Sequence, residues 1–175
     1  ISDFYLNILK VTPVFVLLLM LLARVWDAVN DPIMGMIADR VNPKRGKMKP
    51  YLLMTPVPIA FLTFLLFFAP NISPAAKMVY AAMTYVLWGM VYTMSDVPFW
   101  SLPNLMTANP AERGRIFSIA RTTNGIGSAT PMIIFMVLGF VLPKTGLSGL
   151  ELEKTKYIII ALFAAVLGNI LFANT

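Results

Sequence analysis

The sequence contains no cysteine and no histidine, and only 13% of its 175 residues are charged. The first two absences exclude disulfide bonds, thiol nucleophiles, imidazole bases and the usual zinc ligands. The low charged fraction argues against a soluble domain, in which about 25% of residues are charged. Because 58% of the residues are hydrophobic and the mean hydropathy is +0.76, the composition indicates an integral membrane protein.

Basic residues outnumber acidic ones by 14 to 8, which gives a net charge of +6. They gather in polar segments between apolar runs, as membrane topology requires, so we expect no nucleic acid partner. Five basic residues lie within residues 39–49, and this loop is therefore predicted to be cytoplasmic. The chain begins at Ile1 and its last apolar run stops at Thr175, so we expect residues 1–175 to be a partial domain of a longer protein.

Five hydrophobic helices are predicted, and about 20 residues suffice for each to cross the membrane. Pro56 and Pro58 predict a bend in the second helix, and Pro98 is expected to kink or end the third. Short loops make successive helices antiparallel, so the predicted fold class is an all-α, polytopic membrane helical bundle. The expected spans are residues 11–38, 50–69, 75–102, 111–142 and 156–174, with an external loop or helix end over residues 1–10 and an external loop over residues 143–154.

The first span carries its polar residues on one side. On a helix with about 3.6 residues per turn, one face holds Arg24, Asp27, Asn30 and Asp31, and apolar residues cover the other faces. A charge at the middle of a bilayer costs about 2.5–3.5 kcal/mol on insertion scales. These groups are therefore expected to face protein, water or an ion rather than lipid.

The third and fourth spans carry similar polar faces, with neighbours three or four residues apart. At about 1.5 Å of rise per residue, Asp27 and Asp31 of the first span can converge with Asp96 and Arg121 between the middle and the cytoplasmic half of the membrane. The third face consists of Tyr85, Gly89, Tyr92, Thr93, Asp96 and Trp100, and the fourth of Ser118, Arg121, Asn124, Gly125 and Ser128.

Oxygen atoms on the first and third spans suit a small cation. Asp27 and Asp31 supply carboxylates, Asn30 supplies a carbonyl and Thr93 a hydroxyl, which together fit Na⁺, Li⁺ or a proton. Two negative charges this close favour a cation or proton bound between them. We expect a monovalent cation site at Asp27 and Asp31, and no organic cofactor.

A second group of residues suits a sugar. Asp96 accepts hydrogen bonds from hydroxyl groups and Arg121 donates them in a planar fork, while the Trp100 ring offers a flat face for a pyranose. A cation site beside a sugar site would couple the two ligands, because each would strengthen the binding of the other.

Structural roles are the alternative for several of these residues. Arg24 and Asp27 could form an intramembrane ion pair that only holds helices together, and Trp100 could be an anchor at the membrane interface. Against a purely structural role for the acids, they outnumber the arginines available to neutralise them. Packing or close helix contact explains Tyr85, Trp88, Gly89, Gly125 and Ser128 without a role in binding.

A different class of protein would be an intramembrane aspartyl protease, using Asp27 or Asp31 together with Asp96. Such proteases resemble one another in a GxGD sequence, which neither WDAVNDP nor MSDVPFW provides. We therefore do not expect an enzyme.

Three segments, RVWDAVNDPIMGMIADR, RGKMKPY and YVLWGMVYTMSDVPFWSL, together resemble the glycoside–pentoside–hexuronide:cation symporter family, which includes melibiose permease and belongs to the major facilitator superfamily. Gly35, Asp39 and Arg40 also look like the loop motif of that superfamily, which gates the inner side. The resemblance covers most of residues 3–121. It implies that the five spans are helices two to six of twelve, without the first helix and the C-terminal half.

Carried over by position, the resemblance places the cation at Asp27, Asn30, Asp31 and Thr93 and the sugar at Asp96, Trp100 and Arg121, with Tyr92 and Arg24 as supporting groups. It implies a symporter that moves a glycoside with Na⁺ or H⁺ by alternating access, in a bacterial cytoplasmic (inner) membrane. Its partners would be the lipid bilayer and the missing C-terminal half. Relatives of this family also move lysolipids, but the polar sugar group favours a substrate rich in hydroxyls.

Overall fold

A computed structural model describes residues 1–40 and 48–173, and all regular elements in these ranges are helices. The predicted all-α bundle is therefore confirmed. The long helices are α1 (Pro13–Arg40), α4 (Pro74–Met106), α5 (Pro110–Val141) and α6 (Gly149–Ala173). The shorter ones are the π-helix η1 (Phe4–Ile8), α2 (Lys49–Met54), α3 (Pro56–Leu66) and the 3-10 helix η2 (Leu142–Thr145).

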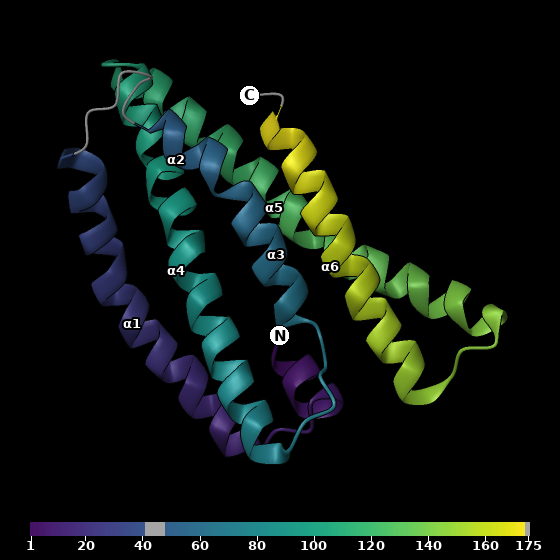
Figure 1. Ribbon diagram of the computed structural model, residues 1–175. Coiled ribbons are helices and arrows are strands. Elements are labelled where there is room, and N and C mark those ends of the chain that lie inside the picture. The colour runs from purple at the N-terminus through teal and green to yellow at the C-terminus, as the bar shows by residue number, and fades with distance from the viewer. Residues whose placement is uncertain (41–47, 174–175) are drawn as a thin grey trace.

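The central helix of the bundle is α4. Figure 1 shows α1 on one side of α4 and α3 on the other, with α6 beyond α3 and α5 crossing behind α3 and α6. Contacts join α4 to α1, α2, α3 and α5. Polar residues on different faces of α4 can therefore meet different neighbouring helices.

The starts of α4 and α5 follow from short sequence signals. Ser73 and Asn109 each precede a proline, and their side chains accept hydrogen bonds from the backbone N–H groups of Ala76 at 3.4 Å and Ala111 at 3.0 Å. Such residues are favoured before a helix because they satisfy its free N–H groups, and proline suits the first helical position. The predicted starts at residues 75 and 111 are thus within one residue of the observed ones.

The predicted bend in the second span is confirmed as a break at Thr55. α2 ends at Met54 and α3 begins at Pro56, because a proline has no N–H to continue the ladder of backbone hydrogen bonds. The Thr55 hydroxyl donates to the Tyr51 carbonyl at 2.8 Å, which supplies a polar contact where the ladder is interrupted.

The expectation that Pro98 could end the third span is wrong, since α4 continues through Pro98 and Pro103 to Met106. Both prolines are buried against neighbouring helices, and the Ser101 hydroxyl donates to the Val97 carbonyl at 2.8 Å. Membrane helices tolerate proline where neighbours and hydroxyl groups satisfy the freed backbone. Packing therefore outweighs the local penalty.

The expected external loop over residues 143–154 is also partly wrong, because α6 already begins at Gly149. Two pairs spaced by three residues support its first turns: Glu151 with Lys154 at 3.0 Å and Glu153 with Lys156 at 2.6 Å. Such pairs stabilise a helix, and an acid in its first turn adds to this.

Residues 1–10 pack more closely than the predicted loop or helix end. Phe4 and Tyr5 of η1 are fully buried in an apolar cluster with residues of α1, α3 and α4. The Tyr5 hydroxyl donates to the Ala81 carbonyl at 3.3 Å, and the Tyr157 hydroxyl donates to the Asp3 carboxylate. This segment therefore ties α4 and α6 together at one end of the bundle.

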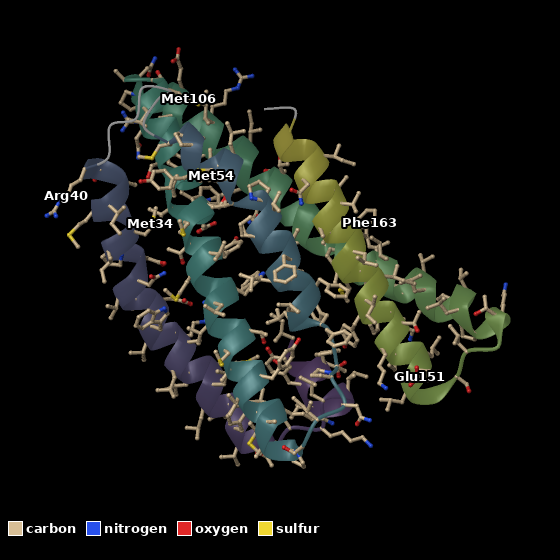
Figure 2. The ribbon with its side chains drawn as sticks, viewed as in Figure 1. Met34, Arg40, Met54, Met106, Glu151 and Phe163 are labelled. Carbon is tan, nitrogen blue, oxygen red and sulfur yellow. The ribbon has the colours of Figure 1, made fainter. Side chains whose placement is uncertain are left out.

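By length and hydropathy alone, two of the described segments can cross a membrane: Pro13–Arg40 and Pro110–Thr145. Pro56–Leu66 is a shorter apolar helix. The other two predicted spans, α4 and α6, are long helices as well, but this measure does not identify them as spans within the described residues. Figure 2 shows Arg40 of α1 and Met106 of α4 near one end of the bundle and Glu151 of α6 near the other.

Candidate functional site

The two acids of α1 lie against α4. Thr93, which is only 5% exposed, donates a hydrogen bond to Asp31 Oδ1 at 3.1 Å. One turn earlier on both helices, a Cβ added to Gly89 would lie 3.8 Å from Asp27 Oδ1. Gly89 therefore lies against the Asp27 carboxylate, which is half-buried, whereas Asp31 is exposed apart from its bond to Thr93.

Neither acid is neutralised by a basic side chain in residues 1–40 and 48–173. Among the described residues, neither Asp27 nor Asp31 forms an ion pair, so the alternative Arg24–Asp27 pair is not formed. Arg24 is exposed and Asn30 is half-buried. The same described ranges hold no cluster of three or more acids of the kind a divalent metal needs. The Asp31 carboxylate and the Thr93 hydroxyl are oxygen groups of the kind that bind hard cations.

Asp96, Trp100 and Arg121 come together between α4 and α5. Trp100 Nε1 donates to Asp96 Oδ1 at 3.1 Å, and the guanidinium carbon of Arg121 lies 5.6 Å from the centre of the Trp100 ring. The Phe117 ring stacks on the same indole at 6.4 Å. The indole N–H is thus held inside the protein, which differs from an interfacial anchor, and Arg121 occupies part of the ring face that was expected to receive a sugar.

A cavity of about 570 Å³ opens beside this group, a size typical of small-molecule sites. Its lining includes Tyr92, Asp96 and Trp100. Arg121 contacts this wall through Trp100. The complete lining comes from Ile59 of α3, from Tyr92, Ser95, Asp96, Phe99 and Trp100 of α4, and from Ala120, Thr123 and Asn124 of α5.

The acid pair and the cavity do not share a wall among the described residues. Asp27 lines a separate space of about 30 Å³ together with Gly89, and Asp31 and Thr93 are absent from the lining of the larger cavity. What joins the two groups is α4 itself, on which Thr93 and Asp96 are three residues apart. The prediction that all four charged residues converge is therefore wrong for these helices: Asp27 and Asp31 lie on the α1 side of α4, and Asp96 and Arg121 lie on its α5 side.

Trp88 connects these two groups. Its ring stacks on Tyr92 at 5.0 Å with 16° between the planes, and it also lines the small space beside Asp27. Trp88 Nε1 donates to the Thr63 hydroxyl of α3 at 3.0 Å, which fixes the ring. The prediction that Trp88 packs rather than binds fits this geometry, but its packing positions a cavity residue.

The residues of the predicted gating motif lie at the far end of α1. Gly35 has open space around it, and Arg40 is the last residue of the helix. Nearby, Met34 and Ala38 are buried with Met48 in a small apolar cluster that joins α1 to residues before α2. Asp39 is also at this end, and the basic loop residues 41–47 that were predicted to be cytoplasmic lie outside the described residues.

Sequence reasoning did not select Ser95 or Thr123 as binding residues, and it noted Asn124 only as part of a polar face. The structure brings all three to the cavity. Helical spacing could have indicated Asn124, which is one turn from Arg121, but Ser95 has no comparable signal because its neighbours depend on how α4 packs.

A polytopic helical membrane protein with a pair of acids on α1 and a polar cavity between α3, α4 and α5 is the class that fold and site define. Residues 1–175 match the family described as "MFS/sugar transport protein" over their whole length. The chain belongs to this family, as the sequence motifs predict.

Curated relatives include the "Inner membrane symporter YicJ" of Escherichia coli (strain K12), which is 36% identical over 110 residues, covering 63% of this chain and 24% of the relative. The "Isoprimeverose transporter" of Lactiplantibacillus pentosus is 30% identical over 172 residues, covering 98% of this chain and 36% of the relative. The "Sodium-dependent lysophosphatidylcholine symporter 1-A" of Danio rerio is 26% identical over 126 residues, covering 71% of this chain and 24% of the relative. The chain thus spans about a third or less of the length of these relatives.

Proposed function

We propose that the protein containing residues 1–175 is a secondary transporter that moves a sugar or glycoside together with Na⁺ or H⁺ by alternating access. Residues 1–175 would supply helices two to six of a twelve-helix transporter, and a first helix and C-terminal half would complete the cavity. Family membership and a relative named as an isoprimeverose transporter support a sugar as cargo. A relative named as an inner membrane symporter supports the bacterial cytoplasmic membrane as its location.

The observation that carries this proposal is the arrangement on α4. Thr93 bonds to Asp31 on the α1 side, while Asp96 lines the cavity on the side of α3 and α5. A cation held by Asp27 and Asp31 would neutralise two unpaired acids, and a sugar would bond to Asp96. Because both ligands act on one helix, each would favour the helix position that the other needs, which gives reciprocal coupling.

Sugar uptake by the full-length transporter, measured with and without Na⁺, tests the proposal. Asp31→Cys should abolish the Na⁺ stimulation because it removes a carboxylate from the cation group. Thr12→Cys, at an exposed position just before α1, is the matched control and should leave uptake unchanged. Unchanged Na⁺ stimulation in Asp31→Cys would show that the cation assignment is wrong.

A lysolipid is the second candidate cargo, since one relative is named as a lysophosphatidylcholine symporter. An acyl chain would favour a wholly apolar cavity, whereas Asp96, Ser95 and Asn124 place polar groups in this one. Binding of α-galactosides, β-glycosides, pentosides and lysophosphatidylcholine should be compared, and we expect a glycoside to bind best.

The arrangement also supports transport over an intramembrane aspartyl protease. Such an enzyme needs two carboxylates that share one proton, about 3 Å apart. Asp96 lines the large cavity, while Asp27 lines a different space and Asp31 bonds to Thr93. Peptide cleavage that disappears in Asp96→Ala would contradict this choice.

A further inference from the structure

Ser95 is a buried serine whose hydroxyl lacks a partner. The residue is 7% exposed and lines the cavity between α3, α4 and α5. Its side chain makes no hydrogen bond within residues 1–40 and 48–173. In those ranges, Arg113 Nε is the one side-chain nitrogen or oxygen atom that is fully buried and has no hydrogen bond. The Ser95 hydroxyl also has no hydrogen bond, so it is not fully buried and stays accessible from the cavity.

Hydroxyl groups elsewhere on these helices behave differently. Most donate to the backbone carbonyl one turn earlier: Thr84 to Tyr80 at 2.8 Å on α4, and Thr123 to Ile119 at 3.0 Å on α5. This is the usual way for a helical serine or threonine to satisfy its hydroxyl. Ser95 does not use it, and a buried polar group without a partner destabilises a protein unless a ligand or water completes it.

Asn124 faces the same cavity from α5. It also makes no hydrogen bond within the described part of the chain. Its carboxamide offers an N–H donor and a carbonyl acceptor, as a serine hydroxyl offers both functions. Neither side chain is charged, so each matches a neutral group that both donates and accepts, which is the property of an alcohol and of neither a carboxylate nor an ammonium.

We propose that Ser95 and Asn124 bind a hydroxyl group of a neutral glycoside and so determine which sugars the cavity accepts. Their role differs from that of the Asp96–Trp100 pair, in which the Asp96 carboxylate already accepts a hydrogen bond from the Trp100 indole N–H. This inference rests on the proposed function, because it requires that the cavity holds a sugar.

Binding by the full-length transporter in membrane vesicles tests the inference. The probes are the p-nitrophenyl α-galactoside, β-glucoside and β-xyloside, followed by the monodeoxy analogues of the one that binds. Ser95→Ala and Asn124→Leu should each lower the affinity for the parent glycoside about fivefold, which is the effect of losing one hydrogen bond. For the one analogue that lacks the recognised hydroxyl, the affinity of each variant should lie within about twofold of the affinity of the unaltered protein.

Thr122→Val, on the same helix α5, is the matched control. Thr122 does not line the cavity and its hydroxyl already donates to the Ser118 carbonyl at 2.9 Å, so we expect less than about a twofold change with every probe. Na⁺ affinity should stay unchanged in Ser95→Ala, which checks that the variant is folded.

The outcomes separate the inference from the proposed function. If the unaltered transporter binds glycosides but Ser95→Ala weakens the parent and all deoxy analogues equally, or not at all, the inference is wrong and the function stands. If it binds no glycoside of the panel, the proposed function fails and the inference fails with it.

Discussion

Gly89 leaves the space that the Asp27 carboxylate fills. A Cβ at this position would be in ordinary contact with Asp27 Oδ1 at 3.8 Å, but a larger side chain would take the place of the carboxylate. We expect Gly89→Ala to keep Na⁺ affinity within about twofold and Gly89→Leu to lower it more than about tenfold, a change of about 1.4 kcal/mol. The Na⁺ dependence of sugar binding by the full-length transporter measures both.

Gly125 provides the comparison, because nothing lies within 4 Å of a Cβ added there. Gly125→Leu should therefore leave Na⁺ affinity unchanged. Equal effects of leucine at positions 89 and 125 would mean that the space beside Asp27 has no part in cation binding.

The Trp100 N–H orients the Asp96 carboxylate. Trp100→Phe keeps an aromatic ring beneath Arg121 but removes this donor, whose bond to a charged group is worth about 1.5–3 kcal/mol. We expect about a tenfold loss of glycoside affinity with Na⁺ affinity within about twofold. Phe117→Leu removes the stacked ring and leaves the hydrogen bond, so it should cost less; an equal loss would assign the effect to ring packing.

At this scale the sequence predicted what depends on helical spacing alone. Asp27 and Asp31 lie one turn apart, and so do Gly89 and Thr93, which was enough to foresee that these faces could meet. The unbonded hydroxyl of Ser95 could not be foreseen, since its meaning depends on which side of α4 meets α5.

Among the elements, α3 and α4 are joined by a side-chain bond next to the cavity. The Thr63 hydroxyl accepts the Trp88 N–H, and Trp88 stacks on Tyr92. Thr63→Val has nearly the same volume but cannot accept this bond, so we expect glycoside affinity to fall about two- to fivefold as Tyr92 loses its support. Thr130→Val on α5 is the control, because that hydroxyl donates only to its own helix. Equal affinities in both variants would contradict a positioning role for Trp88.

The helix boundaries show where local sequence suffices and where packing decides. The Ser-Pro and Asn-Pro pairs fixed the starts of α4 and α5, and Pro56 fixed the break after α2. Pro98 carries the same local signal, yet α4 passes through it because its surroundings bury and satisfy that stretch. No rule based on the chain alone distinguishes these prolines.

For the whole molecule, the surface of the bundle is strongly apolar. Val14 is 69% exposed, Met132 75% and Phe140 72%, and no described residue of α5 is buried. In a membrane protein such surfaces meet lipid or further helices. Since the chain covers 36% of the isoprimeverose transporter it matches, both kinds of neighbour are expected for the full-length protein.

Reciprocal coupling is the prediction at this scale. The factor by which Na⁺ raises glycoside affinity should equal the factor by which the glycoside raises Na⁺ affinity. Trp100→Phe should weaken the glycoside but leave this factor unchanged, whereas Asp31→Cys should bring it close to one. Titrations of each ligand in the presence and absence of the other measure this coupling factor. Unequal factors in the two directions would mean that the two ligands do not shift the same conformational equilibrium.

The placement of Thr93 and Asp96 within one turn of α4 has a consequence for leakage. So short a stretch of helix moves as a rigid unit, and a change there disturbs ion and sugar together. In the proposed arrangement, α1 would contact the ion alone and α5 the sugar alone. Variants that let ions cross without cargo should therefore arise on these two helices, and a selection for uncoupled transporters should recover few substitutions in α4.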